Sequence, residues 1–369
     1  MYQPILLYSW SKKVAKAFAP LSKPQSYVLA ACSFGIIRAQ RCTLGRIAER
    51  LCSLGKADSV ERRLQRFLAN PRIGLEPGCR CLAGWVLSSL VFGGKTLVLL
   101  VDETSLGEHL KVMAVCLAYR GRAIPLAWWC YHQEHYPMKS IELIDTLLGW
   151  VAPSLPVGCR VLVEVDRGLG CSPALAKKLR GRGFDYLVRV TKQMRLRLAN
   201  KQEVQIGSLV QGPGQQWSGP VEAFGSEHWE SCWAMIYWGP GHQEPWLLLA
   251  SWAEAPARGY GWRMWEELAF RDFKSYGWHW HRSRVWEPEH ANRLWLAMAL
   301  AYAWTISLGT QAVQAQAVRK EVTRGKTIRR SLVVLGIRVL RRAGKLRRHI
   351  VTFFDFLFLP GDLPESVVQ

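Results

Sequence analysis

Acidic residues are scarce in this 369-residue sequence: 28 Asp and Glu accompany 49 Lys and Arg, a formal net charge of +21. A chain this basic favours a polyanionic partner, either nucleic acid or an anionic membrane surface, over a small acidic substrate. The chain also lacks the polar, highly charged composition of a disordered protein, because 49% of its residues are hydrophobic and 21% are charged. The length allows two or three domains with a sizeable buried core.

Segments that mark membrane, secreted and zinc proteins are absent too. The longest apolar run, Leu294 to Ile306, is shorter than the roughly 20 residues that cross a bilayer, so it predicts a buried helix and no membrane partner. The lysines near the N-terminus follow a short apolar stretch, the reverse of the order in a secretory signal. Cys79 and Cys81 lack the second pair that a zinc site needs. We expect reduced, packed cysteines in a cytoplasmic protein.

The positive charge is concentrated at the two ends of the chain. Residues 1–90 hold 14 Lys and Arg against 4 Asp and Glu, and residues 319–348 hold 12 against 1. Residues 200–256 instead hold one Lys, six Glu and six of the 18 tryptophans, which predicts a different kind of surface. The C-terminal run is either a solvated face or, as we expect, a site for a phosphate backbone. Its arginines include Arg329, Arg330, Arg341, Arg342, Arg347 and Arg348.

Two short helices with basic outer faces are predicted in the first section. One begins after Thr43, an N-cap residue followed by apolar residues at helical spacing. The other should start at Asp58, with Glu61 as its capping-box partner, and stop before Pro71. Such a pair is typical of a small DNA-binding bundle, although a solvated helical pair is the alternative. The arginines on the outer faces are Arg46, Arg50, Arg62, Arg63 and Arg66.

Two apolar runs are each followed directly by an aspartate. Leu97 to Val101 precedes Asp102, and Val161 to Val165 precedes Asp166. Strands buried on both faces that deliver a carboxylate at their C-terminal ends are typical of an α/β sheet, although either aspartate alone could cap a turn. The sequence around them predicts a hairpin with strands over 112–119 and 123–129, helices over 140–151 and 173–182, and a strand over 184–190.

A stripe of four polar side chains is the most specific feature. At about 100° per residue, Tyr260, Arg263, Glu267 and Lys274 fall within about 60° of one helical face. Glu266 and Asp272 point away from that face and are poorer candidates. Exposed ion pairs one turn apart are the alternative explanation, but they do not account for this combination beside two strand-end aspartates.

With these motifs, over about residues 40 to 310, the sequence resembles the DDE transposases of insertion-sequence family four. The family signature is Tyr, two residues, Arg, three residues, Glu, six residues, Lys, and the stripe beginning at Tyr260 matches it. Asp102-Glu-Thr-Ser and Asp166-Arg-Gly resemble the two aspartate motifs. One departure is Leu169-Gly170, where a larger or aromatic residue is expected. The stretch between Asp166 and Glu267 resembles the β-rich insertion of the family.

The resemblance implies an α/β fold: a ribonuclease-H-like mixed sheet flanked by helices, with a β-rich insertion and an N-terminal helical DNA-binding domain. The boundaries expected are 1–90 for the helical domain, 91–190 for the first part of the core, and 191–256 for the insertion. Residues 257–310 would hold the second part of the core with the catalytic Glu helix, and 311–369 a basic C-terminal region.

The resemblance also implies metal-dependent DNA chemistry. Three converging carboxylates, Asp102, Asp166 and Glu267, would repel one another without a cation, and their oxygens suit two Mg²⁺ or Mn²⁺ ions, with Asp102 as the bridging ligand. Tyr260, Arg263 and Lys274 would bind phosphates of the cut end. A tryptophan of the insertion would stack on a flipped base, and Trp238, Trp246 and Trp252 are the candidates.

The expected function is cut-and-paste movement of an insertion sequence through strand nicking, hairpin formation, hairpin opening and joining to target DNA. The partners implied are transposon ends, target DNA and a second copy of the chain in a synaptic complex, at the bacterial nucleoid. Two alternatives remain: a non-mobile DNA-binding regulator derived from a transposase, and a ribonuclease-H-like endonuclease without strand transfer. A regulator has no use for the three carboxylates, whereas the endonuclease would share the same ions.

Overall fold

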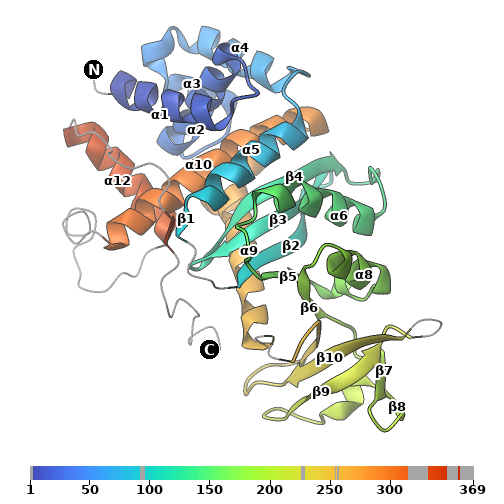
Figure 1. Ribbon diagram of the computed structural model, residues 1–369. Helices are drawn as coiled ribbons and strands as arrows, with labels where there is room; N and C mark the ends of the chain where they lie inside the picture. Colours follow the sequence, from blue (N-terminus) through green and yellow to red (C-terminus); the bar gives the residue numbers. More distant parts are fainter. Residues whose placement is uncertain are drawn as a thin grey trace.

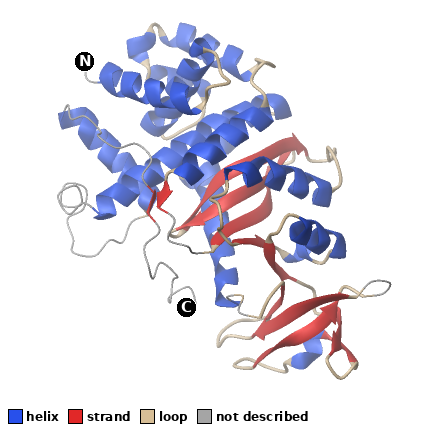
Figure 2. Ribbon diagram, in the orientation of Figure 1, coloured by secondary structure: helices blue, strands red, loops and turns tan. Residues whose placement is uncertain are grey.

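The computed structural model describes residues 3–91, 96–225, 229–253, 255, 257–314, 331–346 and 356–357. It is a mixed α/β structure in which a ten-stranded sheet is flanked by helices (Figure 1). Helices gather above the sheet and strands dominate the opposite end (Figure 2). The helices are α1 (Gln3–Ala17), α2 (Lys23–Ala39), α3 (Leu44–Glu49), α4 (Ala57–Leu68), α5 (Leu75–Ser88), α6 (Ser140–Val151), α7 (Arg167–Gly170), α8 (Pro173–Gly181), α9 (Arg263–Arg271), α10 (Pro288–Gln314) and α12 (Leu332–Leu346).

The sheet has the strand order β4-β3-β2-β5-β6-β11-β10-β9-β7-β8. Within it β2, β5 and β6 are parallel neighbours, and the remaining pairs are antiparallel. A separate parallel pair joins β1 (Leu90–Val91) to β12 (Phe356–Leu357). The strands of the large sheet are β2 (Leu97–Leu106), β3 (Leu110–Tyr119), β4 (Arg122–His132), β5 (Val161–Val165), β6 (Asp185–Arg189), β7 (Arg195–Leu198), β8 (Glu203–Gln205), β9 (Gln216–Ala223), β10 (Glu230–Tyr237) and β11 (Trp246–Ala250).

The predicted hairpin, helices and strands of the central region are confirmed. β3 and β4 form the hairpin, and α6 spans the predicted 140–151. The apolar runs before the two aspartates form β2 and β5, and all ten residues from Leu97 to Val101 and from Val161 to Val165 are buried. One detail differs: β2 does not end at Asp102 but continues to Leu106, because its antiparallel pairing with β3 extends beyond the shorter parallel pairing with β5.

Helices cover both faces of the sheet. Trp129 of β4 stacks on Trp150 of α6, with ring centroids 5.6 Å apart. Its neighbour Trp128 packs against Trp295 of α10 instead. Since adjacent strand residues point to opposite faces, α6 and α10 lie on opposite sides of β4. α9 lies on the α10 side, because Phe270 of α9 also packs against Trp295.

The long helix α10 organises the upper half of the molecule. It contains Leu294 to Ile306, which is buried as predicted. One described helix, α10, has the length and apolarity to cross a bilayer, and 89% of its most apolar window is buried within the protein. α12 crosses it closely at Gly309 and Gly336, where a Cβ on Gly336 would lie 1.8 Å from the carbonyl oxygen of Thr305.

The N-terminal helices pack directly on α10. Trp10 of α1 stacks on Trp304 of α10 with centroids 3.8 Å apart. Arg293 of α10 is buried and donates hydrogen bonds to the carbonyl oxygens of Leu68 and Ile73, at the end of α4 and just after it. One face of α4 is buried, and the helix begins at Ala57 with Lys56 as its N-cap, one residue before the predicted start at Asp58. The helical region and the sheet therefore share one continuous buried core.

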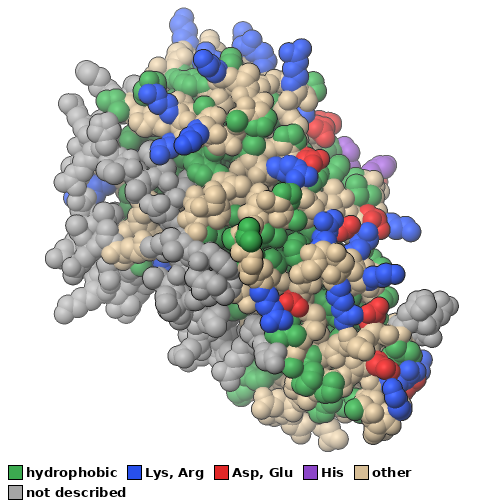
Figure 3. Space-filling model, viewed as in Figure 1, with side chains coloured by type: hydrophobic (Ala, Val, Ile, Leu, Met, Phe, Trp, Pro, Cys, Tyr) green, Lys and Arg blue, Asp and Glu red, His purple; other side chains and the backbone are tan. Residues whose placement is uncertain are grey.

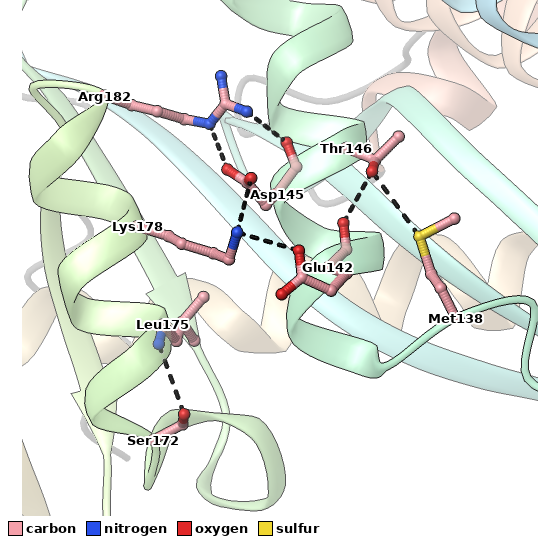
Figure 4. Close-up of polar contacts among 8 residues, drawn as sticks. All are labelled: Met138, Glu142, Asp145, Thr146, Ser172, Leu175, Lys178 and Arg182. Atoms are coloured by element: carbon pink, nitrogen blue, oxygen red, sulfur yellow. Dashed lines mark hydrogen bonds and ion pairs between the residues drawn. The ribbon is translucent and has the colours of Figure 1, made fainter.

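Ion pairs hold α8 against α6, as Figure 4 shows. Asp145 of α6 accepts hydrogen bonds from Arg182 Nε (2.5 Å) and Lys178 Nζ (3.2 Å), and Lys178 also pairs with Glu142 at 3.0 Å. Ser172 caps α8 by accepting the backbone N–H of Leu175. Because α8 directly follows α7, these contacts fix the segment that carries Asp166.

Paired charges cover the glutamate-rich block of residues 200–256. Glu203 and Glu222 contact Arg197, and Glu230 contacts Arg180. Acidic side chains on the face in Figure 3 accordingly lie beside Lys and Arg. The block is therefore different in composition, as predicted, but its described glutamates are largely neutralised by arginines that precede it in sequence. None of the ten cysteines, all of them described, forms a disulfide.

Candidate functional site

Asp102 and Asp166 lie at the same level of neighbouring parallel strands. The register pairs Val101 of β2 with Val165 of β5, so the two aspartates follow at corresponding positions. Asp166 is the N-cap of α7, where its Oδ1 accepts the backbone N–H of Gly168 at 2.6 Å. Asp102 Oδ1 accepts the N–H of Glu103. In each carboxylate the other oxygen, Oδ2, faces Arg263.

Arg263 brings the three predicted carboxylates together. Its Nη2 lies 3.2 Å from Asp102 Oδ2 and 3.8 Å from Glu267 Oε1, and its Nη1 lies 3.7 Å from Asp166 Oδ2. The Arg263 and Asp102 side chains are 14% and 15% exposed, whereas that of Glu267 is 50% exposed. Residues from β2, the end of β5 and α9 therefore converge on one guanidinium, where the parallel pairing of β2 and β5 ends.

The predicted single helical face around Glu267 is replaced by three short helical segments. Tyr260 lies in the 3₁₀ segment η4 (Ala257–Trp262), Arg263 and Glu267 lie in α9, and Lys274 lies in the π-helical turn η5 (Asp272–Tyr276). Glycines lie at both departures. Gly259 and Gly261 flank Tyr260 and disfavour an α-helix, and a Cβ on Gly277 would lie 2.4 Å from the Asp272 carbonyl oxygen.

The four side chains of the stripe nevertheless gather around the same carboxylates. The negative charge of Asp102 acts on Lys274, although burial is the larger effect and lowers the pKa of that lysine. Burial raises the pKa of Tyr260, while the nearby Arg263 opposes the rise. Tyr260 packs edge-on against Trp246, with centroids 5.6 Å apart. The three helical segments differ in pitch, but Arg263 and Lys274 still lie close to Asp102.

The two acids set aside in the sequence, Glu266 and Asp272, lie in different surroundings. Glu266 is fully buried, and burial raises its pKa well above the ordinary value. Asp272 pairs with Arg122 at 3.0 Å and accepts the Tyr302 hydroxyl at 2.9 Å, so it anchors η5 to α10. Glu164 of β5 is also fully buried, and its carboxyl oxygens have no hydrogen-bond partner among the described residues.

Electrostatics at the site favour an added cation. Burial raises the pKa of Asp102, Arg263 opposes the rise, and the neighbouring Asp166 and Glu267 add to it. In Arg263, burial works against the charge, but attraction to Asp102 and other acidic groups outweighs it and raises the pKa. The guanidinium thus offsets carboxylate repulsion that divalent ions would offset more completely.

The donor set fits Mg²⁺ or Mn²⁺, because all three groups offer carboxylate oxygens. In the described part of the chain, no group of three or more His, Cys, Asp or Glu is gathered tightly enough to hold an ion. Arg263 lies between the three carboxylates, so an ion shared by them requires its guanidinium to move aside. Asp102 belongs to the strand that contacts both of the other elements, because β2 lies beside β5 and α9 packs against β2.

The three candidate tryptophans occupy different environments. Trp238 lines a cavity of about 560 Å³ whose walls include Arg167, Arg189 and Lys192. Trp246 packs against Tyr260, and Trp252 is covered by the Arg160 guanidinium, 3.9 Å from the ring centroid. One wall residue of the Trp238 cavity, Arg167, directly follows Asp166 in the chain.

The arginines on and next to α3 and α4 occupy four different environments. Arg46 pairs with Glu49 at 3.0 Å. Arg63 is partly buried, and Arg50 is exposed and lines a basic pocket beside α12. Arg62 and Arg66 line a groove of about 910 Å³. Of the C-terminal arginines, Arg341 and Arg342 lie on α12, and Arg329, Arg330, Arg347 and Arg348 lie outside the described residues.

Sequence reasoning missed other residues of that groove. Arg284, Trp286 and His290 line it together with Arg62 and Arg66. These residues follow Lys274 closely in the chain, but nothing in their spacing singled them out. The loop after the stripe, with its basic and aromatic residues, was the available signal.

No family model matches this chain, and no curated protein sequence is similar to it.

Proposed function

We propose that this protein is a DDE transposase similar to those of insertion-sequence family four. The convergence of Asp102, Asp166 and Glu267 on Arg263 carries the proposal, because acids far apart in the chain meet at one point. The strand order β4-β3-β2-β5-β6, with β2, β5 and β6 parallel and β3 and β4 antiparallel, supports a ribonuclease-H-like core.

Asp102, Asp166 and Glu267 are the proposed ligands of two Mg²⁺ or Mn²⁺ ions. Such ions supply activation of an attacking oxygen and stabilisation of the leaving 3′ oxygen of a phosphodiester. Arg263 and Lys274, both close to Asp102, would hold the phosphates on either side of the scissile bond. The Tyr260 hydroxyl adds a neutral donor for a phosphate oxygen.

DNA would extend from this site toward the arginines of the helical region. Arg62 and Arg66 share their groove with Arg284 and Trp286, which follow the catalytic segment in the chain. Phosphate contacts of this kind fix the register of a duplex without reading its sequence. The N-terminal helices would thus act as a DNA-binding domain that is packed onto the core.

Trp238 is the proposed stacking partner of a base turned out of the duplex. It lines a cavity whose walls carry three basic side chains, among them Arg167, the residue after Asp166. Trp246 and Trp252 already pack against Tyr260 and Arg160. Stacking of a base on an aromatic ring contributes roughly 1–3 kcal/mol. A homodimer is proposed as the working unit, since two transposon ends must be cut together.

Cleavage by carboxylate variants tests this proposal. Asp102→Asn, Asp166→Asn and Glu267→Gln should each abolish Mg²⁺-dependent cleavage of end DNA while leaving duplex binding largely intact. Glu103→Gln is the matched control, because Glu103 lies next to Asp102 but pairs with Lys111 at 2.7 Å; it should cleave normally. Unchanged cleavage by any of the first three variants would contradict the assignment.

Product analysis separates the three candidate functions. A transposase gives hairpin ends and joined target products. The endonuclease alternative gives nicks without joined products, and the regulator alternative binds DNA without cutting it. Denaturing gels of a labelled end fragment, incubated with Mg²⁺ and a target plasmid, distinguish these outcomes.

A further inference from the structure

A pocket lined almost entirely by cations lies where α12 meets α2 and the end of α3. Its volume is about 660 Å³. Among the described residues that line it, none is acidic, and glycine is the one lining residue without charge. The cationic lining consists of Arg38, Arg50, Arg338, Arg341, Arg342 and Lys345.

Segments some 300 residues apart in the chain build this pocket. Arg341 Nη2 donates to Gln40 Oε1, at the C-cap of α2, with a distance of 2.5 Å. A Cβ on Gly344 would lie 3.6 Å from Arg38 Nη1, so the α12 backbone passes close to Arg38. The packing of α12 on the N-terminal helices therefore fixes the positions of the lining residues.

Like charges gather around Arg38 in this pocket. Burial lowers the pKa of Arg38, and the positive charges of Arg50 and Arg341 lower it further. Arg38 Nε is buried and has no hydrogen-bond partner among the described residues. Guanidinium groups bind phosphate through paired hydrogen bonds, so a phosphate-bearing ligand matches this lining.

We propose that this pocket is a second DNA-backbone site, in which α12 and the N-terminal helices together grip phosphates away from the carboxylate cluster. The inference rests on the proposed DNA-binding function. The position of Arg50 favours a DNA duplex as the ligand. Arg50 is the C-cap residue of α3, one of the two helices with proposed DNA contacts, and it also lines this pocket. A backbone that follows α3 therefore reaches α12, which joins the C-terminal basic region to the same DNA.

The salt dependence of DNA binding tests the inference without any cleavage. The variant Arg341→Gln/Arg342→Gln/Lys345→Gln changes three exposed positions on α12. The logarithm of its affinity for a duplex should fall less steeply with the logarithm of salt concentration. The slope should be reduced by about 0.9 for each phosphate that the variant no longer neutralises, or about 2 to 3 in total. Fluorescence anisotropy with a duplex of about 30 base pairs, without divalent ions, measures this slope.

A charge-matched control separates this site from general attraction. Lys139→Gln/Lys177→Gln/Lys201→Gln also removes three exposed charges, at the N-cap of α6, on α8 and in the turn between β7 and β8. Its slope should equal that of the wild type. Arg341→Lys/Arg342→Lys, which retains both charges, should restore most of the slope and guards against a folding defect.

The outcomes distinguish this inference from the proposed function. A reduced slope confined to the α12 glutamine variant supports the pocket, even if the wild type never cleaves DNA. Equal slopes for the α12 variant and the wild type overturn the pocket while the carboxylate assignment stands. A wild type that shows no salt-dependent duplex binding overturns both.

Discussion

Replacing Arg263 with methionine should destabilise the protein in a way that divalent cations repair. The change keeps much of the length of the side chain but removes the charge that three carboxylates share. Removing one partner of a buried ion pair costs about 3–5 kcal/mol, whereas an exposed pair contributes at most about 1 kcal/mol. The Arg263 and Asp102 side chains are mostly buried and Glu267 is half exposed, so we expect a loss of about 2–3 kcal/mol between these limits.

Adding Ca²⁺ tests whether the lost charge can be replaced by a cation, because Ca²⁺ binds carboxylate oxygens as Mg²⁺ does but with looser geometry. An ion at about one hundred times its dissociation constant stabilises the folded state by about 2.7 kcal/mol. In the Arg263→Met variant the ion meets three uncompensated carboxylates, so Ca²⁺ should restore most of the lost stability. In the wild type the gain should be smaller, because the ion has to displace the guanidinium. Urea unfolding followed by tryptophan fluorescence, with and without Ca²⁺, measures both.

The sign of the pH dependence follows from the same contacts. Arg263 opposes the rise that burial causes in the pKa of Asp102, so the variant should have an Asp102 pKa that is higher still. A carboxyl group with a raised pKa destabilises the fold where it must ionise, and this cost disappears as the pH falls below the raised pKa. The deficit of Arg263→Met should therefore be full at neutral pH and shrink in acid.

Arg122→Met is the matched control for cation repair. Arg122 pairs with Asp272 at 3.0 Å, and the two side chains are 17% and 18% exposed, close to the values for Arg263 and Asp102. This pair lies outside the carboxylate cluster. Its variant should lose comparable stability and gain nothing extra from Ca²⁺. Equal cation responses in Arg263→Met, Arg122→Met and the wild type would refute the shared cation site.

Trp238→Ala should reduce both hairpin yield and the 2-aminopurine signal of a flipped base, since stacking contributes roughly 1–3 kcal/mol, whereas Trp252→Ala should leave both unchanged. Mn²⁺ affinity followed by electron paramagnetic resonance should rise with pH over a range above that of an ordinary aspartate, because burial raises the pKa of Asp102 and the ion binds its ionised form; a flat profile would exclude Asp102 as a ligand. Gly336→Ala should lower the free energy of unfolding by about 1–3 kcal/mol or more, because its Cβ meets the α10 backbone. Asp145→Ala should lower the free energy of unfolding by about 1 kcal/mol at neutral pH and by less in acid. Burial raises the pKa of Asp145, but Arg182 and Lys178 outweigh burial and lower it. The stabilisation from Asp145 is therefore lost as the pH falls through that lowered pKa.

The meeting of the two aspartates was predictable from local sequence. Apolar runs of five residues indicated the two strands, and the C-terminal ends of parallel strands share one edge of a sheet. The spacing of Arg263 and Glu267 also placed them one turn apart, as observed. The preference for Glu267 over Glu266 followed from the same periodicity, and the full burial of Glu266 agrees with it.

The helical pitch around these residues was not predictable from spacing alone. Tyr260 is held in a 3₁₀ turn and packs against Trp246, which lies on β11. Lys274 lies in a π-helical turn whose Asp272 is tied to Arg122 and Tyr302. These partners come from distant parts of the chain, so tertiary contacts outweigh the local periodicity. The departure from the family motif at Gly170 also depends on a distant residue, because a Cβ there would lie 2.8 Å from the Arg189 carbonyl oxygen.

Counting charges by segment did not show which charges pair. Residues 200–256 differ in composition from the rest of the chain, but the arginine partners of Glu203, Glu222 and Glu230 lie before that segment. Conversely, Arg38 and Arg50 belong to the N-terminal region in sequence, yet they join Arg341 in one pocket. A count along the chain identifies which segments carry charge, whereas only the fold decides which charges are neutralised.

Arg263 couples cation binding to DNA binding in the proposed enzyme. Without cations its guanidinium is engaged with Asp102, Asp166 and Glu267 and offers little to a phosphate. Divalent ions held by those carboxylates would take over the neutralisation and release the guanidinium toward the scissile backbone. End DNA should therefore bind more tightly with Ca²⁺ than without it, and Arg263→Met should lose this difference. Equal Ca²⁺ enhancement in the variant and the wild type, measured by anisotropy at constant ionic strength, would show that Arg263 does not provide the coupling.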